Sequence, residues 1–303
     1  MIRSRRISIE GLAPWFSEEL NRAENGSYVL RVLNERAGGR AVVWNELKAY
    51  VQEAHDDARR KLRAALAPDL SPFRSSTDDP ASGYPQDLHI QTLMGYFGEI
   101  LAGMAAEHTR LHNSQSWIVP AFPFRFHQVA FQKLEDRRNL LLQRGSVGDV
   151  DSPAAIIPGR TGNDVLAFLR GDDGELLRVM VCEAKCLATH RPDKLSEGHS
   201  QLSKSLECPS GVRDLIELLS DYTEQPAREW REILQRFRFG SPQVGRVNVL
   251  VYSTGNKPAG LEGRTSWAPR DKAHPDYSGE RKLEVVEIHL SDLVSLVREI
   301  YRG

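Results

Sequence analysis

The chain has 303 residues, 40% of them apolar and 27% charged, which is typical of an ordinary soluble globular protein with one large domain or two modest ones. Its 40 basic and 41 acidic residues leave a formal net charge of −1, which excludes a protein that holds nucleic acid through an overall basic surplus. The sequence has no run of ~20 apolar residues, no secretory signal core and only three cysteines, so we expect a cytoplasmic protein with no membrane partner.

The first 85 residues are predicted to form a mainly helical N-terminal region. The expected elements are a short strand at Ile7–Pro14, a helix from Trp15 to about Ala23, a strand at Ser27–Asn34 and a long amphipathic helix over Trp44–Leu66. Residues 67–86 then contain four prolines and several serines, which is typical of a linker or a long loop. We therefore predict two domains, over residues 1–85 and 86–303.

A helix is predicted over Leu88–Glu107, with Asp87 as its cap. One face of this helix carries small residues and a single carboxylate, Glu99, between Gly95 and Gly103. Glycine inside a helix costs ~1 kcal/mol relative to alanine, so two on one face indicate that another element packs closely there. Glu99 is then either the rim of a tight helix crossing or a carboxylate that the helix supplies to a site.

The segment after this helix alternates in part but contains two prolines, so Trp117–Phe126 is predicted to be an edge strand or an extended arm. Its aromatic side chains are expected in the core rather than as platforms for stacked bases. A helix is predicted at His127–Gln143, and Asp149 and Asp151 follow in a loop rich in glycine and proline. These two aspartates compete with Asp164 as metal ligands, but no apolar strand follows them directly.

A β-hairpin is the strongest local prediction in the chain. Two apolar runs, Val165–Leu169 and Leu176–Cys182, flank the turn-forming segment at residues 171–174. Because side chains alternate along a strand, Glu183 and Lys185 share one face at the end of the second run. Asp164 precedes the first run, so the hairpin is expected to bring its carboxylate alongside them.

This arrangement suits a hard divalent cation. Mg²⁺ prefers one or two carboxylates together with phosphate oxygens and water. Lys185 would position or deprotonate an attacking water and offset charge in a phosphoryl transition state. The alternative is a strand end in solvent, where Glu183 and Lys185 form an ion pair worth ~0–1 kcal/mol.

The remaining elements alternate between helix and strand. The expected helices are Lys194–Leu206, Gly211–Tyr222, Ala227–Phe237 and Asp292–Tyr301, and the expected strands are Val247–Tyr252, buried on both faces, and Leu283–His289. Together these predict an α/β core with a mixed sheet.

Two other kinds of site, a zinc site and an ATP-binding loop, are less well supported than the hairpin site. Cys182, Cys186, His190 and His199 lack the paired spacing of structural zinc sites, and the two cysteines are expected to be buried apolar residues. The sequence also has no Walker phosphate loop, so ATP-driven unwinding would have to come from another chain.

The Asp164, Glu183 and Lys185 pattern resembles the PD-(D/E)xK nuclease superfamily, although Gly162-Asn163 replace the proline of its motif. The resemblance implies a restriction-endonuclease-like mixed sheet flanked by helices and a Mg²⁺ (or Mn²⁺)-dependent deoxyribonuclease. Asp164, Glu183 and Glu99 would hold the metal, and Lys185 would assist the water. A helix after the lysine strand often supports the site in this superfamily, which weakly implicates Gln201. RNA remains possible as substrate.

The whole layout is also similar to the nuclease subunits of Hachiman antiphage systems, which share the Gly98-Glu99 helix before the core. That resemblance implies a DNA endonuclease held in check by a helicase/ATPase partner, which agrees with the near-zero net charge and the missing ATP site. Two alternatives stay open. One is a non-catalytic adaptor with a nuclease-like fold, and the other is a stand-alone restriction endonuclease whose recognition domain is residues 1–85.

Overall fold

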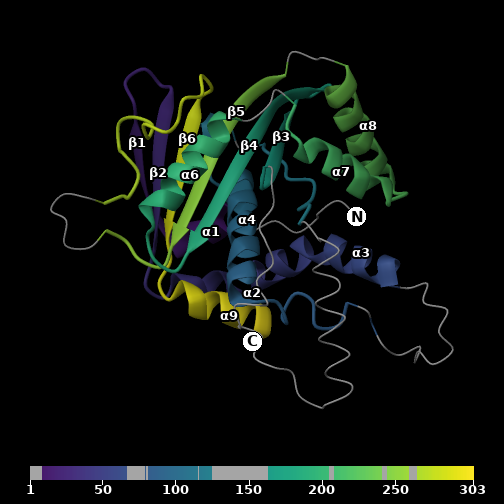
Figure 1. Cartoon of the computed structure of the whole chain (residues 1–303), viewed down its shortest axis with the longest axis horizontal. Coiled ribbons are helices and arrows are strands. Elements are labelled where there is room, and N and C mark those ends of the chain that lie inside the picture. The colour runs from purple at the N-terminus through teal and green to yellow at the C-terminus, as the bar shows by residue number, and fades with distance from the viewer. Residues whose placement is uncertain are drawn as a thin grey trace.

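A six-stranded mixed sheet, with helices on both faces, organises the part of the protein that the computed structural model describes (Figure 1). The described residues are 9–66, 79, 81–114, 116–124, 163–204, 208–240, 244–258 and 265–303. The predicted α/β class, with helices in the N-terminal region, is confirmed. Within these ranges no helix has both the length and the apolar character needed to cross a bilayer.

The sheet has four parallel central strands and an antiparallel strand at each edge, in the order β1-β2-β6-β5-β4-β3. The strands are β1 Phe16–Arg22, β2 Tyr28–Glu35, β3 Val165–Arg170, β4 Leu176–Leu187, β5 Gly245–Thr254 and β6 Leu283–His289. Strands β5 and β6 are buried on both faces, as expected for central parallel strands, and the prediction for β6 matches its observed bounds.

Helices cover both faces of the sheet. The described helices are α1 Ile9–Trp15, α2 Gly39–Ala54, α3 Asp56–Leu66, α4 Ile90–His108, the short 3₁₀ helix η1 Leu111–Asn113, α6 Pro192–Ser203, α7 Gly211–Ser220, α8 Gln225–Phe239 and α9 Leu293–Arg302. Helices α2, α4 and α9 pack on one face, and α6, α7 and α8 on the other (Figure 1).

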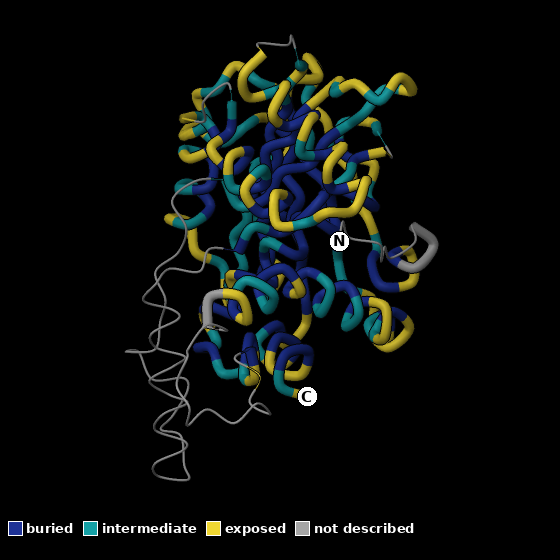
Figure 2. Tube along the Cα trace, turned by 90° about the vertical axis from the view of Figure 1, so that its right-hand side faces the viewer, coloured by how far each residue is buried: buried dark blue, intermediate teal, exposed yellow. Residues whose placement is uncertain are grey.

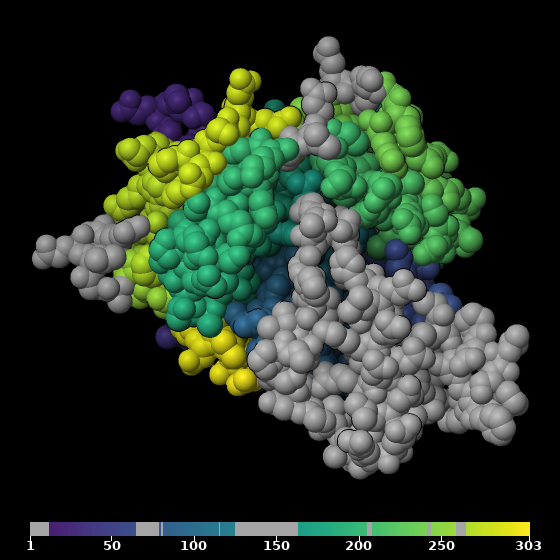
Figure 3. Space-filling model, in the orientation of Figure 1, coloured from purple at the N-terminus to yellow at the C-terminus, as the bar shows by residue number. Residues whose placement is uncertain are grey.

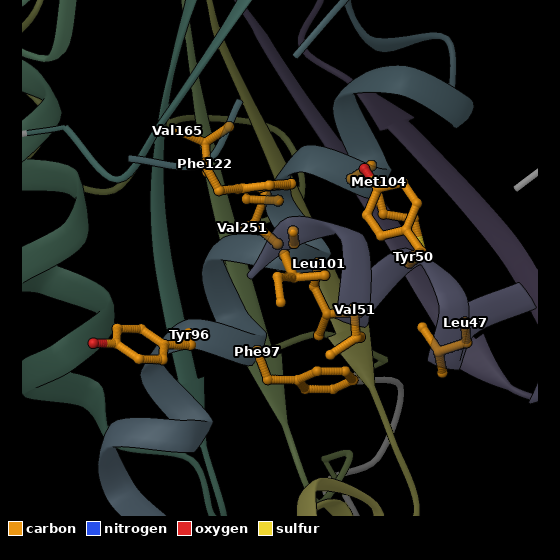
Figure 4. Packing of buried hydrophobic residues seen from close by; sticks show 14 of the residues in the cluster. Leu47, Tyr50, Val51, Tyr96, Phe97, Leu101, Met104, Phe122, Val165 and Val251 are labelled. Carbon is orange, nitrogen blue, oxygen red and sulfur yellow. The ribbon is translucent and has the colours of Figure 1, made fainter. Parts of the chain in front are cut away.

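Each face has its own hydrophobic core. The core under α2, α4 and α9 joins Tyr50 and Leu101 to Val165 and Val251 of the sheet (Figure 4). Phe122 enters the same core, where its ring stacks on that of Phe124 at 5.6 Å, so these aromatics pack inside as predicted. Along the trace, buried residues run through the middle of the molecule and exposed residues gather at its outer turns (Figure 2).

The predictions for the first two elements are wrong, because helix and strand are exchanged. Residues 9–15 form α1, and Phe16–Arg22 form β1. The ladder with β2, which begins with Phe16 opposite Glu35, supplies the backbone hydrogen bonds and buries Phe16. Exposed and half-buried residues alternate along β1, which is the period of an edge strand rather than of a helix.

The long helix predicted over Trp44–Leu66 is interrupted at His55. Its imidazole is fully buried, and the two ring nitrogens lie 2.8 Å and 3.2 Å from the hydroxyls of Tyr84 and Tyr301. The chain therefore breaks between α2 and α3 so that this ring can enter the core. The cap of α4 also differs from the prediction, since His89, not Asp87, accepts the backbone N–H of Gln91.

The N-terminal region shares the sheet and the core with the rest of the chain. Strand β2 pairs with β6, and α2 packs against α4. An independently folding unit over residues 1–85 stays a prediction. The helix predicted at His127–Gln143, with Asp149 and Asp151, lies outside the described residues.

Candidate active site

The β3–β4 hairpin sets Asp164 beside Glu183. Val165 pairs with Cys182, so the next pair outward in this register is Asp164 and Glu183. Asp164 donates its backbone N–H to the Cys182 carbonyl at 3.2 Å, and its Oδ2 accepts the Ala184 N–H at 2.7 Å. Asp164 is therefore bonded to the main chain on both sides of Glu183, through its backbone N–H and through its carboxylate.

Lys185 lies on the same face of β4 as Glu183, as the alternation of a strand predicts. Its Nζ donates to Glu183 Oε1 at 3.0 Å, to Glu197 Oε1 at 3.0 Å and to Gln201 Oε1 at 3.3 Å. Glu197 and Gln201 belong to α6, which covers this face of the sheet (Figure 1). The structure thus brings together Asp164, Glu183, Lys185 and Gln201.

Glu197 is a site residue that the sequence analysis missed. It stands one helical turn before Gln201, and its Oε2 accepts Lys194 Nζ at 2.5 Å. Residues four apart share a helix face, so a helix that turns Gln201 toward the site also turns Glu197 toward it. The signal that could have found it is the i, i+4 spacing of these two polar residues within the predicted helix.

The electrostatics of the site favour a bound cation. Burial, together with the neighbouring charge of Asp164, raises the pKa of Glu183 to about 8, although Lys185 acts in the opposite direction. Burial would lower the pKa of Lys185, but Glu183 and Glu197 raise it above its usual value. The hydrogen bond from Lys194 is the main reason that the pKa of Glu197 is lowered. The site therefore combines a firmly charged lysine with a buried carboxyl whose ionisation is unfavourable.

Glu99 approaches from the other face of the sheet. Its neighbour Gly98 meets β4 closely, because a Cβ on Gly98 would lie 2.8 Å from the Cβ of Cys186. The charge of Glu99 adds to burial in raising the pKa values of the nearby Tyr96 and Tyr301. A role for Glu99 as a metal ligand stays a prediction.

The small-residue face of α4 is only partly covered as predicted. Gly103 packs against the Phe122 ring, since a Cβ there would lie 2.3 Å from its Cζ. Gly95 is exposed, and a Cβ built on it would meet nothing within 4 Å, so the expectation of a close neighbour is wrong at this position.

The cysteines and histidines considered as zinc ligands belong to other structures. Cys182 is fully buried, and Cys186 is packed against the α4 core. His190 Nδ1 lies 2.9 Å from the Tyr252 hydroxyl, and His199 Nδ1 lies 2.8 Å from the Leu195 carbonyl within α6. Across the described ranges, no three His, Cys, Asp or Glu side chains converge as a ready-made metal site.

The donor set at Asp164 and Glu183 fits Mg²⁺ better than a metal that needs a complete cage of side chains. Mg²⁺ commonly takes one or two carboxylates and completes its shell with water and phosphate oxygens. A cation between the two carboxylates would also relieve the repulsion from Asp164, which adds to burial in raising the pKa of Glu183. The surface on this side recedes between α6 and α7 (Figure 3).

No model of a known protein family matches the chain, and no curated protein matches its sequence.

Proposed function

We propose that this protein is a Mg²⁺-dependent phosphodiesterase that cuts DNA endonucleolytically. The observation that carries the proposal is the pairing of Asp164 with Glu183 across the hairpin, with Lys185 held on the same face. This is the charged trio that the resemblance to the PD-(D/E)xK superfamily implies. Glu99 is the fourth residue of the proposed site.

Asp164 and Glu183 would hold the metal. When bound, Mg²⁺ would supply Lewis-acid stabilisation of a phosphoryl oxygen and a water molecule of lowered pKa. The chain's own contribution is to fix the two carboxylates, through the Ala184 N–H on Asp164 and through Lys185 on Glu183. Such fixed ligands need little reorganisation when charge develops in the reaction.

Lys185 is better suited to stabilise charge than to remove a proton. Its pKa is raised, mainly because Glu183 and Glu197 outweigh burial, so the ammonium form persists at neutral pH. A charged ammonium beside the carboxylates would attract and orient the substrate phosphate. Of the two roles open to Lys185 from the sequence, the contacts therefore favour charge compensation.

The biological setting is proposed from the sequence resemblance. The near-zero net charge and the lack of a Walker loop support a nuclease that a helicase/ATPase partner delivers or restrains. Under this proposal, the pair would act in antiphage defence by degrading DNA once the partner releases the nuclease. Co-purification with the product of a neighbouring helicase gene tests the partnership.

Plasmid cleavage with Mg²⁺ or Mn²⁺, with and without a candidate helicase, tests the catalytic proposal. We expect Asp164→Asn and Glu183→Gln each to lower the cleavage rate by at least ~10²-fold, because each removes a negative ligand from a site whose metal contributes several kcal/mol. Glu175→Gln is the matched control, since this exposed carboxylate on the same hairpin accepts a hydrogen bond from the surface residue Arg236. Equal metal-dependent cleavage by the wild type and both site variants would reject the proposal.

The ion network around Lys185 also favours a second function. Lys185 is bonded to two carboxylates and an amide, which is what a structural network in a non-catalytic adaptor would require. Such an adaptor would use the nuclease-like fold to bind a partner ATPase or DNA. Glu197→Gln separates the two functions. It should lower the stability of an adaptor whose ion network is structural, and it should leave a nuclease with measurable cleavage.

A further inference from the structure

A pocket of about 590 Å³ lies between β1 and the carboxyl end of α4, on the face of the sheet opposite to Glu183. Its floor is Arg31 of β2, which is buried, and one wall consists of exposed side chains of β1. The other wall is the end of α4 together with η1. The volume falls within the ~300–1,000 Å³ that is typical of small-molecule sites.

Strand β1 presents three side chains to this pocket. Glu18, Leu20 and Arg22 are exposed and stand two residues apart, so they share one face of the strand. The ladder sets Leu20 directly opposite Arg31. Arg31 therefore has an acidic and a basic side chain as its two diagonal neighbours, within the reach of long side chains.

Glu284 fixes the guanidinium of Arg31 from the side away from the pocket. Arg31 donates to Glu284 Oε1 from Nε at 3.0 Å and from Nη2 at 2.8 Å, and the Glu284 side chain is only 2% exposed. The remaining nitrogen, Nη1, donates to Glu18 at the pocket. The cation is thus held in place before any ligand arrives, which lowers the ordering cost of binding.

Glu18 marks a position for negative charge in the pocket. Its carboxylate pairs with Nη1 of Arg31, although 46% of the Glu18 side chain is exposed, compared with 7% of Arg31. An ion pair with an exposed partner contributes little, because water competes for the charged group. Glu18 can therefore turn away to solvent when a stronger anion binds Arg31.

Two more arginines line the pocket, one from each wall. Arg22 Nη2 donates to Asn113 Oδ1 at 3.2 Å, so its charge meets a neutral amide and ties β1 to η1. Arg110 stands immediately before η1 on the facing wall. Glu18 is the single acidic side chain among the residues that line the pocket, so an anion there would meet three guanidinium groups.

We propose that this pocket binds a phosphorylated small molecule of about the size of a mononucleotide, through its phosphate group. Arginine binds phosphate oxygens in bidentate fashion. A phosphate monoester carries about −1.5 to −2 charge and three acceptor oxygens, so it can engage Arg31 and Arg22 together and displace the single charge of Glu18. The exposed Leu20 offers apolar surface to the uncharged part of the ligand. The proposal does not depend on nuclease activity at the hairpin.

Isothermal titration calorimetry of the whole chain with adenosine monophosphate (AMP), in EDTA at ~0.1 M salt, tests the inference. We expect Arg22→Gln to weaken AMP binding by roughly tenfold, because one charge-assisted hydrogen bond is lost. Glu18→Gln should tighten binding by about twofold to fivefold, because the competitor for Arg31 is removed. Inorganic phosphate should bind more weakly than AMP, and adenosine should not bind measurably.

Matched controls remove the same charges elsewhere. Arg228→Gln on α8 and Glu46→Gln on α2 change exposed positions outside the pocket and should leave the AMP affinity near that of the wild type. If Arg22→Gln changes the thermal midpoint, Arg110→Gln, also at an exposed position, should show a loss of affinity in the same direction.

Several results would overturn the inference. One is the absence of binding at millimolar AMP in both the wild type and Glu18→Gln, and another is an affinity that Arg22→Gln and Arg110→Gln leave unchanged. An equal loss in Arg228→Gln would reveal a general effect of charge. Adenosine binding as tightly as AMP would show that the phosphate is not recognised, and succinate binding more tightly than AMP would assign the arginines to a carboxylate ligand.

Discussion

Two buried carboxylates in the same sheet, Glu284 on β6 and Glu183 on β4, differ in the charged groups that surround them. Glu284 accepts two hydrogen bonds from Arg31, at 3.0 Å and 2.8 Å, and one from the His112 N–H at 2.7 Å. Glu183 is as deeply buried, but it faces the carboxylate of Asp164 and shares its one lysine with Glu197. Arg31 also bonds the exposed Glu18, but Glu284 itself lies between Val29 and Val249 in the ladders, whereas Glu183 has Asp164 opposite it.

This difference separates a structural ion pair from a binding site. A buried charge normally persists only when it is paired and hydrogen-bonded. Three carboxyl groups and two lysines meet around Glu183, and a cation from outside the chain would favour the ionised form of Glu183 there. At Glu284 the guanidinium of Arg31 already fills that place.

Removing each charge should therefore have opposite effects on stability. Glu284→Gln leaves the buried Arg31 without its main partner and should lower the free energy of unfolding by about 3 kcal/mol. Glu183→Gln keeps an oxygen for Lys185 and removes the repulsion with Asp164, so stability without divalent metal should be unchanged or slightly higher. Urea denaturation in EDTA measures both, and equal losses would contradict the comparison.

The contact between α4 and β4 gives the next prediction, because α4 packs against the strand that carries Glu183 and Lys185. Gly98→Ala would place a methyl group 2.8 Å from the Cys186 Cβ, one residue beyond Lys185. We expect a loss of ~1–3 kcal/mol in stability and a slower cleavage rate, as β4 shifts. Gly95→Ala is the matched control on the same helix: it meets nothing and should stabilise the helix by ~0.5–1 kcal/mol. Thermal unfolding of both variants provides the check.

The pH dependence of stability gives an effect of defined sign. The folded-state pKa of Glu183, about 8, lies above the usual 4.5. Its contribution to stability is therefore full below pH 4.5 and is lost as the pH rises through 8. In EDTA, the wild type should lose thermal stability between pH 5 and pH 8 relative to Glu183→Gln. If thermal stability changes with pH in the same way in both proteins, the charge of Glu183 is already compensated within the fold, and this prediction is wrong.

The hairpin and its trio could be predicted from the sequence because the signals are local. The Asp172 to Gly174 turn between two apolar runs sets the register, and alternation along β4 then sets Glu183 beside Lys185. Strand β5 could also be predicted, as Val247–Tyr252, because a nearly continuous apolar run indicates a strand buried on both faces.

The failures come from long-range contacts. The polar Phe16–Arg22 segment becomes a strand only because β2 lies beside it, and His55 interrupts a helical pattern because Tyr84 and Tyr301 bind its ring from distant positions. Glu197 was missed because its role depends on α6 lying over β4. Local periodicity carries no information on the strand that pairs with Phe16–Arg22 or on the hydroxyls that bind His55.

Metal binding tests the central claim most directly. Isothermal titration calorimetry with MgCl₂ or MnCl₂ at pH 7.5 compares the wild type with Asp164→Asn, Glu183→Gln and the hairpin control Glu175→Gln. The account predicts saturable binding by the wild type and by Glu175→Gln, with binding lost or strongly weakened in the two site variants. Binding that is absent from the wild type, or equal in all four proteins, would contradict a metal site between Asp164 and Glu183.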